Sequence, residues 1–527
     1  MRMKRSPTRH LTLAGVILAA LIVALTPSTL AAAAGPIWLP AAQATHASFD
    51  NLQPVVATYR DHAYILTSRS SGGDALGVYF STNESGTWTT RQLSPKGPPS
   101  SVQDFRTTLA VDTATRKLYA AWVYSRSGHE TLGVWTRDPS GAWSGPVDIA
   151  TSEVFLGPPS IIAAGGKIYV AYAQGADPST ASCHKERGDV FVASYDGTAW
   201  STAQDLTNCV ARDYLQDFHD AKIAADESGR LYLVVGGWDR TGQLWYLENT
   251  AGSWSRPASL VRGWNDTGPG GVDRGDYYSI AASNGTAYVA YAAKGRPPTP
   301  SSYGYREIVL ATRSPGGSWA VRQLTSDPHH CSKYAPWVAA TGGRIAIAYV
   351  FDFGENCYSS PPTNADAGVH MLTGASNALQ EAPRTPNLSN TCGRPALSVD
   401  GNVFRLAALC RRAGDQHDDV YYTPQFFDIV GPTITRLAVP STATAPGVPL
   451  SWAAQDPTPG SGVAYYEVQV KEDSGAGAFR DIVAAPRSTR LTYTETHAGR
   501  RYTFRVSARD RVNNWGSWRF ASTSASS

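Results

Sequence analysis

The sequence predicts an all-β protein: a seven-bladed β-propeller closed by an N-terminal strand, followed by a smaller β-sandwich. Three observations predict this fold. A strand–turn–strand pattern recurs seven times, a tryptophan marks the next strand in most repeats, and the period changes near residue 431. The 527 residues are rich in glycine, proline and aromatics, and only 17% are charged. Such a composition favours short strands and turns over long helices.

Each repeat opens with two short apolar strands joined by a tight polar turn. Turns such as Gly165-Gly166 and Asn284-Gly285 hold residues that tolerate the positive φ of a tight hairpin. A third strand follows each pair. The predicted first and second strands are residues 54–57 and 63–66, 108–111 and 117–122, 160–163 and 167–172, 221–224 and 230–235, 279–282 and 286–291, 337–340 and 344–349, and 396–399 and 403–409.

A fourth strand begins at a tryptophan in five of the repeats, at Trp88, Trp143, Trp200, Trp254 and Trp319. The seventh repeat has no fourth strand of its own. Residues 36–40, around Trp38, have the pattern of one, so we expect them to pair with the seventh repeat and close the ring. Closure removes the exposed sheet edges of an open array. The alternative is an all-β repeat of another kind, such as stacked sandwiches.

Residues 1–34 have the pattern of a secretory signal peptide. Four basic residues, Arg2, Lys4, Arg5 and Arg9, precede an apolar run over 11–25 and a small-residue stretch over 30–34. The run is short for a membrane anchor. We therefore expect a secreted protein without a membrane span.

Removing the signal changes the net charge from +3 to −1, because 42 basic residues and 43 acidic residues then remain. This balance argues against nucleic acid as a partner.

The six cysteines of an exported chain predict disulfides, and the hairpins predict their pairing. Two cysteines at equal distances from a turn lie opposite each other on antiparallel arms. The predicted bridges are Cys183–Cys209, Cys331–Cys357 and Cys392–Cys410. The alternative for each cysteine is a free buried thiol.

The C-terminal residues 431–527 contain seven predicted strands, which is the size of a β-sandwich. Pro449-Leu450-Ser451-Trp452, Tyr466-Glu467-Val468 and the run from Tyr502 to Asp510 resemble a fibronectin type III domain. In that family the tryptophan fills the core and the tyrosine opens the sixth strand. The resemblance covers the whole tail and leaves its role open.

The tryptophan-bearing turns of residues 36–430 resemble the Asp-box of sialidase-like β-propellers. The segment Ser81-Thr82-Asn83-Glu84-Ser85-Gly86-Thr87-Trp88 is the nearest match, and Asp196 opens a similar but shorter turn that ends at Trp200. The motif is structural in that family. The first arginine of the sialidase triad precedes a proline, where this chain has Gln53-Pro54; Arg394-Pro395 resembles that motif but opens the seventh repeat.

Polar residues gather where the predicted first strands begin, and in a closed ring these positions surround one mouth. The candidate catalytic residues are Asp104, Asp217, His219, Asp276 and Tyr277, and the candidate ligand-binding residues are Arg106, Asp220, Tyr278, Lys333, Tyr334 and Arg394. Carboxylates, a histidine and cations together can bind a polar ligand or perform acid–base chemistry. The alternative is a water-filled polar channel whose charges are satisfied.

These observations predict a secreted, monomeric protein that binds extracellular carbohydrate and needs no metal or cofactor. Whether it is an enzyme stays open. A glycoside hydrolase or polysaccharide lyase acting at the mouth is the first alternative, and a protein-binding scaffold is the second.

Overall fold

The computed structural model describes residues 37–38, 41–46, 51–69, 77–94, 107–153, 155–175, 188–207, 218–237, 244–250, 252–261, 278–294, 306–326, 331–351, 367–382, 388, 392–401, 403–411, 417–426, 431–456, 462–473, 477–483, 487–510 and 514–527. Within these ranges every regular element is a β-strand. None of the described segments is a helix that could span a membrane.

The described strands before residue 427 form seven antiparallel sheets, and six of them are built from consecutive strands. The first three are β3 (Asn51–Tyr59), β4 (His62–Arg69), β5 (Gly77–Thr82) and β6 (Thr89–Gln92); β7 (Thr108–Asp112), β8 (Lys117–Arg126), β9 (His129–Arg137) and β10 (Trp143–Ser152); and β11 (Ser160–Ala164), β12 (Lys167–Gly175), β13 (Gly188–Tyr195) and β14 (Gln204–Asp205).

The next three sheets repeat this order. They are β15 (Phe218–Ala225), β16 (Leu231–Gly237), β17 (Leu244–Thr250) and β18 (Ser253–Trp254), with β19 (Ala258–Val261) also on β17; β20 (Tyr278–Ser283), β21 (Thr286–Lys294), β22 (Arg306–Arg313) and β23 (Ala320–Gln323); and β24 (Lys333–Thr341), β25 (Arg344–Phe351), β26 (Gly368–Ala375) and β27 (Gln380–Glu381). The predicted first and second strands fall within these elements or within the last sheet, except that β16 begins at Leu231, one residue after the predicted start at Arg230.

The last sheet joins both ends of this region. It contains β28 (Cys392–Asp400), β29 (Val403–Cys410) and β30 (Asp419–Phe426), and β30 also pairs with β1 (Ile37–Trp38) and β2 (Ala42–Gln43). Trp38 lies opposite Gln425, and Ala42 lies opposite Tyr422. The predicted pairing of the N-terminal strand with the last repeat is confirmed, and a second short strand extends it.

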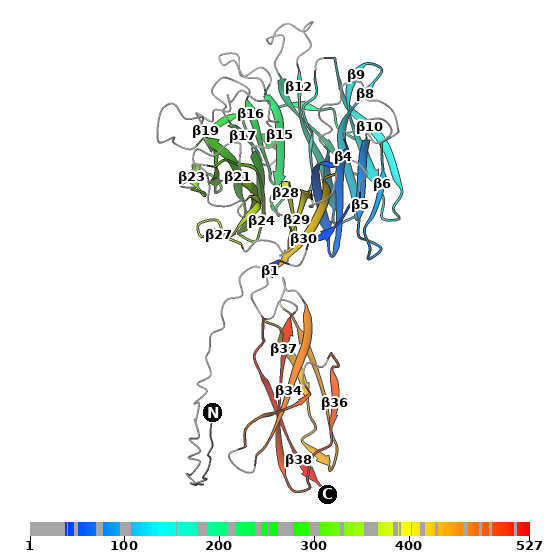
Figure 1. The fold of residues 1–527 in the computed structure, drawn as a ribbon, viewed down its shortest axis with the longest axis vertical. Helices are drawn as coiled ribbons and strands as arrows, with labels where there is room; N and C mark the ends of the chain where they lie inside the picture. Colours follow the sequence, from blue (N-terminus) through cyan, green and yellow to red (C-terminus); the bar gives the residue numbers. More distant parts are fainter. Residues whose placement is uncertain are drawn as a thin grey trace, which may run out of the picture. The chain divides into compact units, whose positions relative to one another are not determined.

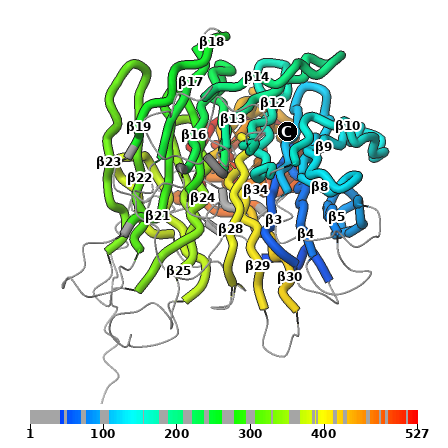
Figure 2. Tube along the Cα trace, turned by 90° about the horizontal axis from the view of Figure 1, so that it is seen from above, coloured from blue at the N-terminus to red at the C-terminus, as the bar shows by residue number. Residues whose placement is uncertain are grey.

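The sheets are arranged as a β-propeller. The first strand of each sheet contacts the first strand of the next, from β3 through β7, β11, β15, β20 and β24 to β28, and β28 contacts β3 again. Both views place the yellow strands β28–β30 beside the blue strands β3 and β4 (Figures 1 and 2). Apolar side chains fill the spaces between neighbouring sheets. Trp122, for example, is 1% exposed and packs in one cluster with Leu66 and Phe80 of the preceding sheet.

Hydroxyl groups link neighbouring first strands. Thr108 Oγ1 accepts a hydrogen bond from the Ile161 amide (3.2 Å), and Ser160 Oγ accepts one from the Ile223 amide (3.1 Å). Ser279 Oγ accepts one from the Val338 amide (2.8 Å). Each hydroxyl thus satisfies an amide on the next sheet that would otherwise lack a partner in a buried place.

The Ser279 link is expected to contribute measurably to stability. Ser279→Ala leaves the buried Val338 amide without its acceptor, which costs about 1–3 kcal/mol. Urea unfolding followed by tryptophan fluorescence measures the change. The exposed Ser253→Ala is the control. Equal unfolding midpoints for the two variants would show that the link contributes nothing.

One predicted disulfide is fully described. Cys392 and Cys410 lie opposite each other on β28 and β29 and form a bond, as predicted. Cys331 is also disulfide-bonded, and its predicted partner Cys357 lies outside the described residues. Cys183 and Cys209 lie outside the described residues as well, so these two pairings stay predictions.

The polar side chains of the turns that resemble an Asp-box accept hydrogen bonds from backbone amides, within the turn at Asp196 and from the neighbouring strand β4 at Asn83. Asp196 Oδ1 accepts hydrogen bonds from the Thr198 hydroxyl and from the amides of Thr198 (2.8 Å) and Ala199 (3.0 Å). These bonds hold the pKa of Asp196 well below its usual value. Asn83, at the corresponding place in the first sheet, accepts a bond from the Ala63 amide (2.8 Å). These side chains shape turns and lie outside the central cavity described below.

The strands after residue 430 form a two-sheet sandwich. One sheet contains β31 (Thr433–Ala438), β33 (Val448–Gln455) and β36 (Arg490–Tyr493). The other contains β32 (Thr442–Thr444), β38 (Arg519–Ser526), β37 (Arg501–Asp510), β34 (Val463–Glu472) and β35 (Arg480–Val483). Alternating residues of both sheets share one core, in which Trp452 is 4% exposed and Phe504 is fully buried.

Candidate functional site

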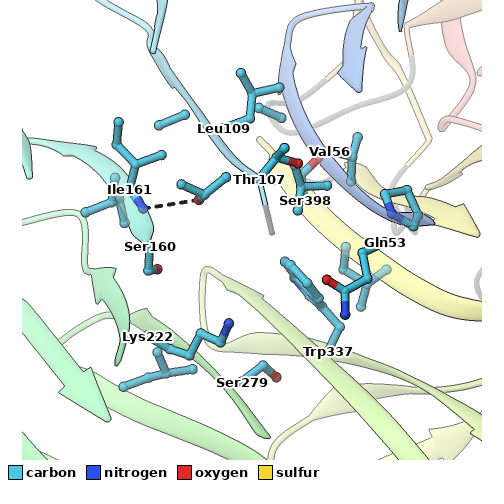
Figure 3. Close-up of a pocket in the computed structure, with 18 of the residues that line it drawn as sticks. Gln53, Val56, Thr107, Leu109, Ser160, Ile161, Lys222, Ser279, Trp337 and Ser398 are labelled. Atoms are coloured by element: carbon cyan, nitrogen blue, oxygen red, sulfur yellow. Dashed lines mark hydrogen bonds between the residues drawn. The ribbon is translucent and has the colours of Figure 1, made fainter. Parts of the chain in front are cut away.

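A central cavity lies where the first strands of the propeller begin. Its volume is about 350 Å³, and its described lining comes from β3, β7, β11, β15, β20, β24, β28 and the residues just before them. The wall is mainly aliphatic, with polar side chains at a few places. Figure 3 shows Gln53, Lys222 and Trp337 directed toward the same space from three different sheets.

In three of the sheets, a residue that lines this cavity has the same strained backbone conformation. Gln53, Ala335 and Arg394 each precede a proline and have a positive φ, of 37°, 50° and 45°. Each residue lies in a β-bulge of the first strand, and each lines the cavity. A non-glycine residue in this conformation costs on the order of 1–3 kcal/mol and is often found at a functional site. A bulge also redirects the side chains beside it.

Two first strands carry a large side chain directly before the amide that donates a link to the preceding sheet, and both side chains line the cavity. Ser160, which accepts one link, directly precedes Ile161, whose amide donates the link to Thr108 of the preceding sheet. By that register, the equivalent residues of β15 and β24 are Lys222 and Trp337. Neither side chain can act as the hydroxyl link, and both are half-buried in the cavity wall.

Two of the predicted site residues line the cavity. Arg394 does so from the bulge at the start of β28. Tyr278 does so from the start of β20, where its hydroxyl accepts a hydrogen bond from the Gly236 amide (2.8 Å) and donates one to the Asp220 carbonyl. The tyrosine thereby links its sheet to the preceding one, and only 3% of it is exposed. Arg394 is therefore a half-buried cation in the cavity wall. Tyr278 is buried, and its hydroxyl connects two sheets.

The other described candidates do not line the cavity. Lys333 is buried and pairs with Glu307 of β22 at 3.2 Å, and its ammonium group also donates to the Cys331 carbonyl (3.1 Å). Asp220 is 4% exposed on β15. Tyr334 follows Lys333 on β24 and is half-buried. These three residues lie on the first strands β15 and β24, and Lys333 has a carboxylate partner within the protein.

Several candidates cannot be placed. Asp104, Arg106, Asp217, Asp276 and Tyr277 lie outside the described residues, and of His219 only the backbone, on β15, is described. Among the described residues that line the cavity, none is an aspartate or a glutamate. The described part of the chain also contains no group of three histidine, cysteine or acidic residues that could hold a metal ion.

Sequence reasoning missed three residues of the cavity: Gln53, Lys222 and Trp337. Two signals could have indicated them. Lys222 is a lone charge in the strand Ala221–Ala224, and an X-Pro pair opens the first strand in three repeats, at Pro54, Pro336 and Pro395. Proline restricts the residue before it, so a repeated X-Pro at one place indicates a shared backbone requirement.

No protein-family model matches this chain, and no curated protein matches it. Solved structures with a similar fold include the polysaccharide lyase Uly1, with 11% identity, a TM-score of 0.47 and coverage of 73% of this chain and 91% of the lyase. A PL25 ulvan lyase bound to -[GlcA(1-4)Rha3S]- has 11% identity, a TM-score of 0.41 and coverage of 78% and 90%. The sialidase of Trypanosoma rangeli in complex with sialic acid has 10% identity, a TM-score of 0.38 and coverage of 92% and 88%.

Proposed function

We propose that this protein is exported and that its seven-bladed propeller binds extracellular carbohydrate in the central cavity. The observation that carries the proposal is the exchange of linking hydroxyls for Lys222 and Trp337. Both residues line a cavity that is also lined by the three strained residues Gln53, Ala335 and Arg394, each of which precedes a proline. Its volume of about 350 Å³ lies within the range of small-ligand sites, which is about 300–1,000 Å³.

The chemistry of these side chains suits a sugar. An indole presents a flat apolar face and a polar edge, so it can pack against the apolar face of a sugar ring. Lys222, Arg394 and the Gln53 amide supply hydrogen-bond donors for hydroxyl or carboxylate oxygens. The aliphatic wall excludes water and strengthens each of these polar contacts.

A glycan array tests the proposal directly. The mature chain is expected to bind a defined set of glycans, and Trp337→Ala and Lys222→Ala are each expected to weaken that binding at least about tenfold, as for truncation of a binding hot spot. Lys117→Ala on β8 is the control. Absence of glycan binding, or unchanged binding by both cavity variants, would contradict the proposal.

An enzyme acting at the same mouth is the first alternative. Glycoside hydrolysis needs two acidic groups, and the acids that could serve here, Asp104, Asp217 and Asp276, lie outside the described residues. Chromogenic glycosides and the absorbance of unsaturated lyase products, measured with the wild type, detect either activity. Loss of such activity in Asp217→Asn or Asp276→Asn would then assign it to the mouth. If neither binding nor activity is detected, the remaining alternative, a protein-binding scaffold, would be favoured.

We also propose that residues 431–527 are a fibronectin type III domain. Its sheets group β31, β33 and β36 on one side and β35, β34, β37 and β38 on the other, an arrangement typical of such sandwiches. The Tyr502 hydroxyl accepts a hydrogen bond from the His497 amide (2.9 Å), as a tyrosine corner does. The buried Trp452 fills the core as the resemblance implied.

A further inference from the structure

A second depression lies on the propeller, away from the central cavity. It is a groove of about 700 Å³ between the sheet β11–β14 and the sheet β15–β18. Its described lining comes from β12, β13, β14, the turn between β15 and β16, and the β17–β18 hairpin. No residue is shared between the described linings of the groove and the cavity.

Side-chain hydroxyl and amide groups dominate the wall of this groove. The polar side chains without a charge are Ser194, Ser201, Thr202, Gln204, Ser228, Asn249 and Thr250. Two aromatic side chains, Tyr169 and Trp254, also line it, and both are half-buried against one apolar cluster between the two sheets. Their packing fixes the rings while part of each stays accessible, which provides rigid apolar surface beside hydrogen-bonding groups.

The charge on the described lining is positive. Lys167 and Arg230 contribute cations, and no aspartate or glutamate is among the described lining residues. Two acids beside the lining residue Ser228, Asp226 and Glu227, already accept hydrogen bonds within the protein, and Asp226 accepts them in part from Ser228 and Arg230. Asp226 accepts hydrogen bonds within its own turn, from the Ser228 amide (2.9 Å) and from the Tyr232 hydroxyl (2.9 Å). Glu227 accepts bonds from the Ser283 hydroxyl (2.7 Å) and the Asn284 amide (2.6 Å) of the next sheet.

We propose that this groove is a second carbohydrate site and that its ligand is an acidic saccharide. A carboxylate or sulfate group lies between Lys167 and Arg230, where charge-assisted hydrogen bonds hold it. A sugar ring packs on Trp254, and the hydroxyls and amides of β13, β14 and β17 bind the ring oxygens. The inference shares only the ligand class with the proposed function, because it concerns other residues in another part of the propeller.

Isothermal titration calorimetry on the full mature chain tests this site separately from the cavity. The chain carries Lys222→Ala and Trp337→Ala, so that the cavity is impaired. The probes are tetragalacturonate for a carboxylate, a sulfated carrageenan tetrasaccharide for a sulfate, and cellotetraose as the neutral reference. At least one acidic tetrasaccharide is expected to bind at one site per chain, at least about tenfold more tightly than cellotetraose, with an affinity that falls as salt rises.

Substitutions in the groove then assign the site. Lys167→Gln is expected to weaken binding of the acidic probe about tenfold, as loss of a charge-assisted hydrogen bond does, whereas Lys117→Gln, at the start of the corresponding strand β8, leaves it unchanged. Trp254→Ala is expected to weaken it by a similar factor. Trp254→Phe retains most of the affinity, which separates stacking from a general loss of structure.

Three results would overturn the groove site. They are failure of both acidic probes to bind the cavity-impaired chain, equal affinity for cellotetraose, and equal affinity of the Lys167→Gln and Lys117→Gln variants. If the wild type binds glycans and the cavity-impaired chain binds none, the result would support the proposed function of the cavity and contradict a carbohydrate site in the groove. Glycan binding by the wild type that is unchanged by the cavity substitutions and disappears entirely with Lys167→Gln would support the groove and contradict the proposed function of the cavity.

Discussion

Replacing Lys333 by alanine is expected to destabilise the propeller by about 3–5 kcal/mol, because it removes the positive charge that pairs with a buried carboxylate. Glu307 is 1% exposed, and its carboxylate lies 3.2 Å from the Lys333 ammonium group. The Thr325 hydroxyl also donates to Glu307, and the ammonium group lies 4.9 Å from the centre of the Phe351 ring. One hydroxyl cannot replace the charge that Lys333 supplies.

A double substitution separates loss of the charge from loss of the side chain. Lys333→Met with Glu307→Gln removes both charges and keeps the volumes and an acceptor for Thr325, so we expect it to recover at least about 2 kcal/mol of the loss. Urea unfolding measures both variants, with Lys117→Ala as the control. If Lys333→Ala keeps full stability and instead loses carbohydrate binding, the lysine is a ligand-binding residue, as the sequence predicted.

The Lys333 environment illustrates which parts of the site could be predicted from sequence. The repeat placed Lys333 at the start of a first strand, and the structure agrees. Its partner Glu307 lies on β22, in the preceding sheet, and only the packing of two sheets brings the charges together. A pattern within one repeat contains no information about that contact, so the sequence could not distinguish a structural ion pair from a ligand-binding cation.

Local features were predicted more successfully for a physical reason. Hairpins depend on turn residues and alternating apolar residues that are adjacent in the chain, so the first and second strands and the Cys392–Cys410 bridge could be predicted. The cavity residues depend on the register between sheets. Lys222 is a lone charge in its predicted strand, but the register that relates it to Trp337 follows from the links of Ser160 and Ser279 to the next sheets.

The second large effect is expected at the closure of the ring, where Asp419 of β30 holds the N-terminal segment. Its carboxylate accepts hydrogen bonds from the Thr45 hydroxyl (2.7 Å) and from the Gln43 amide group (2.7 Å). Thr45 in turn accepts a bond from the Val420 amide (2.9 Å) and is fully buried. Asp419 therefore fixes a contact between residues nearly 400 positions apart, and 7% of it is exposed.

Asp419→Ala is expected to lower the free energy of unfolding by about 3 kcal/mol, because the Thr45 and Gln43 donors, among others, lose a charged acceptor in a buried place. The neighbouring Asp418→Ala is the matched control. Asp418 forms a more exposed ion pair with Arg411 (2.8 Å), so its loss costs no more than about 1 kcal/mol. Urea unfolding gives the energies, and limited proteolysis is expected to release the N-terminal strands first in Asp419→Ala. Equal stability and equal cleavage of the two variants would mean that strand pairing alone closes the ring, and that the buried network contributes nothing to holding its ends together.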